Sequence, residues 1–204
     1  MRSVVGLALA AFAMMSVAEA ATIKKTDYRF YPVSGVTPYD INQSILRQGP
    51  KYGGLSAYGV TTYDYHPSAT CATIPGLDAR VGSFKMELEF LIKLPKLSSE
   101  GRLKSDVKSS WGKFASFVKT HEETHRRIWL GCAKSAEAKI QAMRAKSCSA
   151  LSKQIDKALS NMTKTCNKQH EAFDAAEQKR LARHPFMQKV KNAANRGVQA
   201  LKAR

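Results

Sequence analysis

The stretch that decides the fold is VGSFKMELEFLIKLP, residues 81–95. Its large apolar side chains occupy every second position, and most of the positions between them carry a charge. Successive side chains of a strand point to opposite faces, so this alternation is typical of a strand with one buried and one solvated face. Antiparallel sheets commonly have two such faces, and we therefore expect an antiparallel sheet in the first half of the chain. The positions expected to be buried are Phe84, Met86, Leu88, Phe90, Ile92 and Leu94.

Two further strands and a short helix are expected upstream of this stretch. The segments DYRFYPV (27–33) and GLSAYGVTTYDYH (54–66) are rich in aromatic and β-branched residues, which favour strands. Between them, TPYDINQSILRQGP (37–50) has a capping threonine, a proline at the first helical position and a Gly-Pro stop. We expect a helix there, and a turn at Pro67 and Ser68 after the second strand.

The second half of the chain reads as two long helices. One stripe of residues, spaced by three or four, consists of Val107, Trp111, Phe114, Val118, His121, His125, Ile128 and Cys132. A second stripe runs from Leu151 to Leu181. The chain must reverse between the stripes, and AKSCSALSK (145–153) is the expected turn, with Ser147 or Ser149 as the new N-cap. The fold class is thus α+β, an N-terminal antiparallel sheet with a short helix followed by a long C-terminal helical hairpin.

The chain divides into three parts. Residues 1–20 have the layout of a secretory signal peptide, with Arg2, an apolar run and the small-x-small sequence that ends at Ala20. We therefore expect cleavage near Ala20 and a periplasmic or secreted protein. Residues 21–184 form one α+β domain by length. Residues 185–204 are a basic tail that we expect to be frayed and solvated; a basic amphipathic helix at a membrane surface is the alternative.

The charge balance indicates acidic partners. The chain has 33 Lys and Arg against 16 Asp and Glu, a formal net charge of +17. Such a surface favours an anionic cell-envelope polymer or a membrane surface, although a merely solvated surface has the same composition. Nucleic acid is an unfavoured partner, because the export signal argues against it and no nucleic-acid motif accompanies the charge.

The motif HEETH, residues 121–125, has the spacing H-E-x-x-H on the first long helix. Residues four apart lie one above the other on a helix, so both imidazoles can point at one zinc ion. Glu122 lies beside them, where it can take a proton from a water that the ion activates. This zincin-like pattern predicts a metallopeptidase with Glu122 as general base. The alternative is a pair of hydrogen-bonded core histidines beside a surface glutamate.

The four cysteines indicate how the two helices are aligned. An even number of cysteines in an exported protein favours disulfides. A reversal centred near residue 149 places Cys132 opposite Cys166, which predicts one bond between the helices. Cys148 and Cys166 are about 27 Å apart on one helix, too far to bond, so Cys148 is left to pair with Cys71.

The same alignment supplies candidates for a third zinc ligand. His121 comes opposite Glu177, and His125 comes opposite Phe173, next to Asp174. We take Asp174 as the third ligand, with Glu177 and His170 as alternatives, because each is chemically acceptable for zinc.

Several segments carry a resemblance to a known family. They are YPVSGVTPYDINQSILRQGP, GLSAYGVTTYDYH with Cys71 after it, LIKLP, WGKFASFVKTHEETHRRIW, and Cys148. Together they resemble a bacterial family of uncharacterised exported proteins described as predicted secreted zinc-dependent proteases, over most of residues 28–150. The resemblance implies zinc and peptide-bond hydrolysis. It also implies an aromatic–Asp pair followed by a Thr-x-His-Gly element. Phe173-Asp174 match the pair, whereas Glu177 and Lys179 stand in place of the second element.

Two functions are therefore expected. The first is an exported zinc metallohydrolase, a peptidase acting on a peptide or protein substrate. The alternative is a catalytically degenerate periplasmic binding or structural protein, which uses its basic surface to contact anionic cell-envelope polymer or lipid. The absent Thr-x-His-Gly element and the charge motivate the second.

Overall fold

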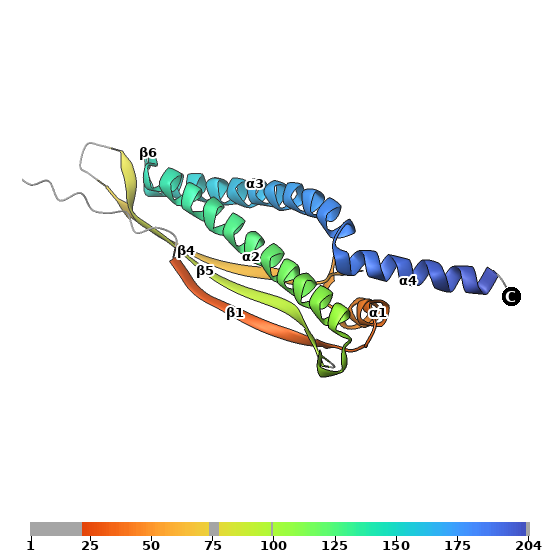
Figure 1. Ribbon diagram of the computed structural model, residues 1–204. Helices are drawn as coiled ribbons and strands as arrows, with labels where there is room; N and C mark the ends of the chain where they lie inside the picture. Colours follow the sequence, from red (N-terminus) through yellow and green to blue (C-terminus); the bar gives the residue numbers. More distant parts are fainter. Residues whose placement is uncertain (1–21, 74–77, 99, 203–204) are drawn as a thin grey trace, which may run out of the picture.

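A computed structural model describes residues 22–73, 78–98 and 100–202. The predicted signal peptide lies outside these residues. The long helices lie along one face of a small sheet, and the last helix extends beyond the body (Figure 1). The elements in chain order are β1 (Thr22–Val33), α1 (Pro38–Gln48), β2 (Lys51–Tyr52), β3 (Leu55–Ser56), β4 (Val60–Ala72), β5 (Ala79–Leu97), a 3-10 turn (Glu100–Arg102), α2 (Ser105–Gln141), β6 (Arg144–Ala145), α3 (Cys148–Ala182) and α4 (Pro185–Lys202).

The main sheet is mixed rather than antiparallel. Its order is β1-β5-β4, with the short β6 also paired to β5. β4 and β6 run antiparallel to β5, but β1 runs parallel to it. The chain reverses twice between β1 and β5, because β4 returns before β5 begins. β5 then enters between the two earlier strands, so the prediction of an antiparallel sheet is wrong for β1. Alternation along one strand reports its faces and not the direction of its neighbours.

The expected alternation of β5 is confirmed. All six predicted positions are buried, while Lys85 and Glu87 between them are exposed and Glu89 is half-buried. On the exposed face Lys24 of β1 forms ion pairs with Glu87 and Glu89. The buried face contacts α2 and α3, and this single-sided burial positions both helices.

β4 is longer than predicted, because Pro67 and Ser68 lie within it rather than in a turn. β4 pairs with β5 on one side only, so it is an edge strand of the described sheet. Proline has no N–H to donate, and an edge strand tolerates it where a central strand would not. The predicted strand at 54–66 is also divided, since β3 ends at Ser56 and β4 begins at Val60.

The helices follow the predicted boundaries closely. Thr37 caps α1 by accepting a hydrogen bond from the Asp40 amide, and Pro38 is its first residue. The reversal between α2 and α3 is where the sequence predicts it, and Ser147 is the N-cap. Its hydroxyl oxygen accepts from the Ala150 amide at 3.2 Å.

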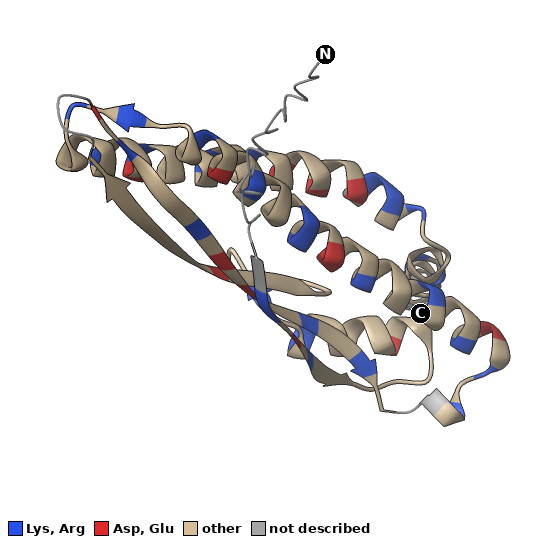
Figure 2. Cartoon of the chain, turned by 90° about the vertical axis from the view of Figure 1, so that its left-hand side faces the viewer, with Lys and Arg blue, Asp and Glu red and all other residues tan. Residues whose placement is uncertain are grey.

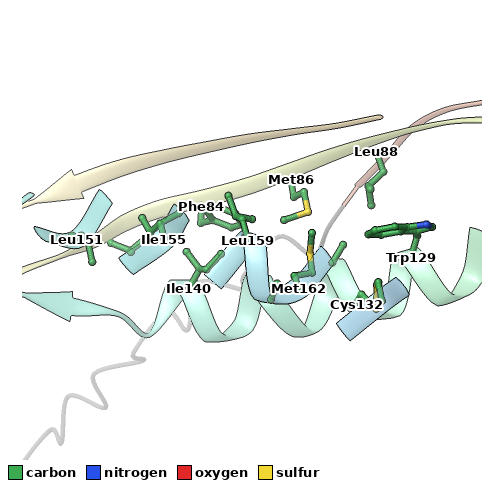
Figure 3. Close-up of a cluster of buried hydrophobic side chains, with 14 of the residues drawn as sticks. Phe84, Met86, Leu88, Trp129, Cys132, Ile140, Leu151, Ile155, Leu159 and Met162 are labelled. Carbon is green, nitrogen blue, oxygen red and sulfur yellow. A yellow bond between two sulfur atoms is a disulfide. The ribbon is translucent and has the colours of Figure 1, made fainter. Parts of the chain in front are cut away.

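The core between β5, α2 and α3 contains alternate residues of the strand and stripes from both helices (Figure 3). Trp129, Met162 and Leu159 contribute the large side chains from the helices. Disulfides join Cys71 to Cys148 and Cys132 to Cys166, the two predicted pairs. The first connects β4 to the start of α3, and the second connects α2 to α3.

The C-terminal tail is not frayed as predicted, because residues 185–202 form α4. Phe186 is fully buried, with its ring centroid 4.6 Å from that of Phe114 and 5.8 Å from that of Trp111. Val190, one turn later, is also buried. Two apolar residues four apart are enough to attach the helix, because they fill one well-packed site. None of the described helices is long and apolar enough to cross a membrane.

We predict that Phe186→Ala lowers the free energy of unfolding by about 3–5 kcal/mol, because it removes a fully buried ring and leaves a cavity. Denaturant titration measures this change. Val198→Ala on the same helix is the control, since Val198 is 52% exposed and should change stability by no more than about 0.5 kcal/mol. Equal, small effects at both positions would show that α4 is not part of the packed body.

Candidate metal centre

Three side chains from α2 and α3 converge on one point. His121 and His125 lie one helical turn apart on α2, and Asp174 faces them from α3. The two Nε2 atoms are 3.0 Å apart. Asp174 Oδ1 lies 3.3 Å from His121 Nε2 and 3.0 Å from His125 Nε2. The three donor atoms thus form a nearly equilateral triangle, and among the described residues this is the group whose spacing would suit a metal ion.

The dimensions of this triangle fit zinc. Zinc binds imidazole nitrogen and carboxylate oxygen at about 2.0–2.2 Å in tetrahedral geometry, which separates any two ligands by about 3.3–3.5 Å. The observed edges are within a few tenths of an ångström of that value. Two imidazoles and one carboxylate also form a donor set typical of catalytic zinc, which leaves one position for water or substrate.

The outer nitrogen of each histidine faces a further side chain of α3. His125 Nδ1 lies 2.7 Å from His170 Nδ1. His121 Nδ1 lies 3.8 Å from Glu177 Oε2. His170, Asp174 and Glu177 are spaced by four and three residues, so they form one stripe along α3. The structure therefore brings all three predicted third-ligand candidates to the histidine pair, but only Asp174 faces both Nε2 atoms.

Glu177 is held in place from its other side. Its side chain is 9% exposed, and Arg180 Nη1 donates to its Oε1 at 2.6 Å. The Arg180 guanidinium in turn lies over the Phe117 ring, 5.7 Å from the centroid. These contacts fix the carboxylate beside His121.

The electrostatics of the pair favour neutral imidazoles. Burial lowers the pKa of His121, against the raising effect of Asp174 and Glu177. Burial, with smaller contributions from His121 and His170, lowers the pKa of His125 to about 3. The neutral imidazole is the form that binds a metal ion. Burial also raises the pKa of Asp174, although the carboxylate remains partly open to solvent with its side chain 45% exposed.

Glu122 lies on a different face of α2 from the histidines. It is buried, and Thr61 Oγ1 of β4 lies 2.8 Å from its Oε2 and 3.0 Å from its main-chain oxygen, so the hydroxyl can donate to either. Burial raises the pKa of Glu122 to about 7, and the Thr61 hydrogen bond opposes that shift. The negative charge of Asp174 raises the pKa of Glu122 further. The alternative of a surface glutamate is wrong for this residue.

β4 can approach Glu122 closely because Gly59 precedes it. A Cβ at Gly59 would lie 2.7 Å from Glu122 Oε1, 2.9 Å from its Cγ and 3.0 Å from Val118 Cγ1. No side chain larger than hydrogen therefore fits at this position without movement of Glu122. Gly59 and Thr61 were not among the predicted site residues, because the only signal for them is a glycine before a β-branched run.

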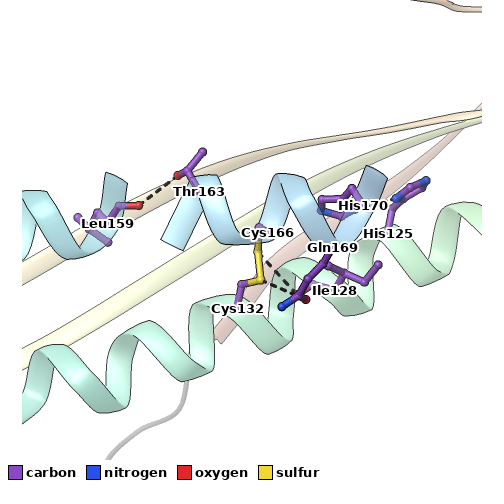
Figure 4. Close-up of a disulfide and its surroundings, with 8 residues drawn as sticks. All are labelled: His125, Ile128, Cys132, Leu159, Thr163, Cys166, Gln169 and His170. Carbon is purple, nitrogen blue, oxygen red and sulfur yellow. Dashed lines mark hydrogen bonds between the residues drawn. A yellow bond between two sulfur atoms is a disulfide. The ribbon is translucent and has the colours of Figure 1, made fainter. Parts of the chain in front are cut away.

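Aromatic rings and a disulfide surround the cluster. Phe173 stacks on His121 with centroids 4.8 Å apart, and Trp129 lies 5.3 Å from His170. The Cys132–Cys166 bond crosses between the helices beside His125 and His170 (Figure 4). The bond holds the register of α2 and α3 about two turns from the triangle.

Comparison with known proteins identifies the family only. No curated protein matches the chain, and no solved structure matches it. Residues 28–185, which include the second half of β1, all of β4, β5, α1, α2 and α3, and every residue of the candidate site, match a family described as a bacterial protein of unknown function, DUF922. The chain belongs to this bacterial family of unknown function.

Proposed function

We propose that the protein is an exported zinc-dependent metallohydrolase that cleaves peptide bonds. The observation that carries this proposal is the triangle of His121 Nε2, His125 Nε2 and Asp174 Oδ1, with edges of 3.0, 3.0 and 3.3 Å. The H-E-x-x-H spacing on a helix supports it, because that spacing is the metallopeptidase arrangement.

One pair of tautomers leaves these three atoms free to bind a cation. In that pair His121 carries its proton on Nδ1, the nitrogen on the Glu177 side, 3.8 Å from Glu177 Oε2. His125 can likewise donate from Nδ1 to His170. Both Nε2 atoms then point lone pairs at each other and at the Asp174 carboxylate. Three acceptors within 3.3 Å repel one another unless a positive charge lies between them. In this account Asp174 is the third ligand, while Glu177 and His170 orient the two imidazoles.

A zinc ion at this position supplies positive charge and a bound water of lowered pKa. The chain provides access, because the Asp174 side chain is 45% exposed while the histidines are mostly covered. Substrate therefore enters on the Asp174 side. Phe173 stacks on the His121 ring and contacts the His125 ring edge-on, so it covers both imidazoles from solvent.

Glu122 is the proposed general base. A base works best when its pKa lies near the operating pH, and burial brings the pKa of Glu122 to about 7. Thr61 holds one carboxylate oxygen, so the carboxyl keeps a fixed orientation. Gly59 allows the strand to pass without displacing it. Glu122 accepts the proton of the attacking water and later delivers it to the leaving amine.

A second candidate function is a periplasmic binding or structural protein with a degenerate site. Its basic surface, net charge +17, would contact an anionic cell-envelope polymer or lipid. The observation that favours it is the replacement of the Thr-x-His-Gly element by Glu177 and Lys179. The first proposal is preferred, because a complete three-atom donor set remains without that element.

Zinc affinity separates the proposed ligand from its supporting residues. We predict that Asp174→Ala abolishes stoichiometric zinc binding, as His121→Ala does. Glu177→Gln should weaken zinc binding by about 10–100-fold, because only a supporting hydrogen bond is lost. Chelator competition with metal analysis measures both. Glu171→Ala, an exposed acidic residue on the same helix, is the control and should bind zinc normally. Zinc-free wild-type protein, or retained zinc in Asp174→Ala, would contradict the assignment.

Glu122→Gln tests the catalytic role. We predict that this variant keeps its zinc and loses at least about 100-fold of metal-dependent proteolysis, because the base is gone while the ligands remain. Release of peptides from an unfolded protein such as casein measures the activity, with chelated wild type as the blank. Zinc binding without any such proteolysis in wild type would favour the binding protein, and undiminished proteolysis in Glu122→Gln would exclude Glu122 as the base.

A further inference from the structure

The outer half of α4 is an uncovered helix. Phe186 and Val190 attach its first two turns to the body, and Lys189 forms an ion pair with Asp106. From Lys191 to Gln199 every residue except Ala193 is exposed. The helix extends away from the rest of the molecule (Figure 1). It also lies beyond the family match, which ends at residue 185. The outer half of α4 therefore takes no part in the described core.

The charges of this helix lie at the borders of its apolar side. The stripe that begins with Phe186 and Val190 continues through Ala194 and Gly197 to Val198 at a helical spacing. On a helix of 3.6 residues per turn, Lys191 falls at one border of this stripe and Arg196 at the other. Uncharged Asn and Gln residues occupy the side between them, opposite the stripe. Residues 185–204 contain no Asp or Glu, whereas Lys, Arg, Asp and Glu are mixed along α2 and α3 (Figure 2).

A second exposed apolar feature lies at the same end of the molecule. Tyr52 and Leu55 are 73% and 76% exposed, the highest values among the large apolar side chains described. They flank the turn of the β2–β3 hairpin, where Gly53 and Gly54 both have positive φ. β3 contacts α1, and α1 contacts α4. The hairpin and α4 therefore both contact the same small helix.

We propose that the outer half of α4 and the tip of the β2–β3 hairpin bind the surface of an anionic lipid bilayer. Cations bordering an apolar stripe suit a helix lying in the bilayer interface, where its charged side chains reach lipid head groups. The hairpin presents an aromatic and an aliphatic side chain that can enter the acyl region. A soluble anionic polymer would account for the cations but not for exposed Tyr52, Leu55 and Val198.

The small apolar stripe of α4 determines how much of the membrane binding is electrostatic. Ala194, Gly197 and Val198 bury little apolar area, so attraction to anionic head groups dominates. Binding is therefore reversible, sensitive to salt and absent on neutral lipid. Since Gly59 lies three residues after β3, a hairpin at the bilayer would hold the start of β4, and Glu122 beside it, close to the membrane.

Vesicle co-sedimentation tests the proposal with the chain from Ala21 onward, which contains every described residue. Vesicles that contain phosphatidylglycerol are compared with vesicles of phosphatidylcholine alone. Wild type should bind the vesicles that contain phosphatidylglycerol at low salt and lose that binding at high salt. It should not bind the vesicles of phosphatidylcholine alone. The double variant Lys191→Glu, Arg196→Glu should weaken the partition coefficient by at least about 25-fold, about five-fold for each cation lost. Tyr52→Ser with Leu55→Ser should weaken it by about ten-fold.

The matched control is Lys153→Glu with Lys164→Glu, two exposed lysines of α3 that give the same change in net charge. The α3 control loses binding only through the change in net charge. We therefore expect it to bind anionic vesicles within about two-fold of wild type. Unchanged thermal unfolding shows that each variant is folded. Equal weakening by the α3 and α4 variants, with no effect at the hairpin, would overturn the proposal and indicate a polymer bound by net charge. Equal binding to neutral vesicles would also overturn it. None of these outcomes depends on zinc or on catalysis.

Discussion

The packing of α2 against α3 in one register is the constraint on which the rest of the structure depends. Two histidines on one helix approach a single carboxylate on the other only if the helices neither slide nor rotate. A slide of one turn, about 5.4 Å, would move Asp174 past the pair. The Cys132–Cys166 bond opposes that slide near the site, and the Cys71–Cys148 bond fixes the start of α3 to β4. The shared core around Trp129 and Met162 supplies the rest of the alignment.

Three faces of α2 contact three different parts of the molecule, namely the apolar core, α3 and β4. Val118 and Phe114 face the apolar core, His121 and His125 face α3, and Glu122 faces β4. The titratable groups are thereby desolvated to different extents by different neighbours. The result is neutral imidazoles beside a glutamate whose pKa is raised to about 7. Burial is the largest cause of both the neutral ligands and the raised pKa of the acid–base group, and this combination is what metal-assisted hydrolysis requires.

The parts of the fold that depend on local periodicity could be predicted from the sequence. The burial of β5, the boundaries of α1 and the reversal before α3 follow from alternation, capping and spacing. Pairing Cys132 with Cys166 predicted the alignment of α2 with α3, and this alignment places Asp174 opposite the histidines. Contacts between segments distant in sequence left weaker signals. The parallel pairing of β1 depends on strand order, which alternation does not encode.

In the candidate site, too, local spacing could be read from the sequence, whereas the contacts of Glu122 with distant segments could not. The H-E-x-x-H motif identifies the histidines, but its glutamate is buried against Thr61 and Gly59, which no spacing rule connects to it. The attachment of α4 was missed because two apolar residues in a basic tail are a small signal, although Phe186 fills a site between Trp111 and Phe114.

Anomalous diffraction at the zinc absorption edge, from crystals of the protein grown with zinc, locates the ion and its ligands. We predict one strong peak bounded by His121 Nε2, His125 Nε2 and Asp174 Oδ1, at about 2.0–2.2 Å from each atom. Glu177 and His170 should lie outside that shell, each beside an outer histidine nitrogen. A peak elsewhere, a peak bound through Glu177 or His170 in place of Asp174, or no peak would contradict it.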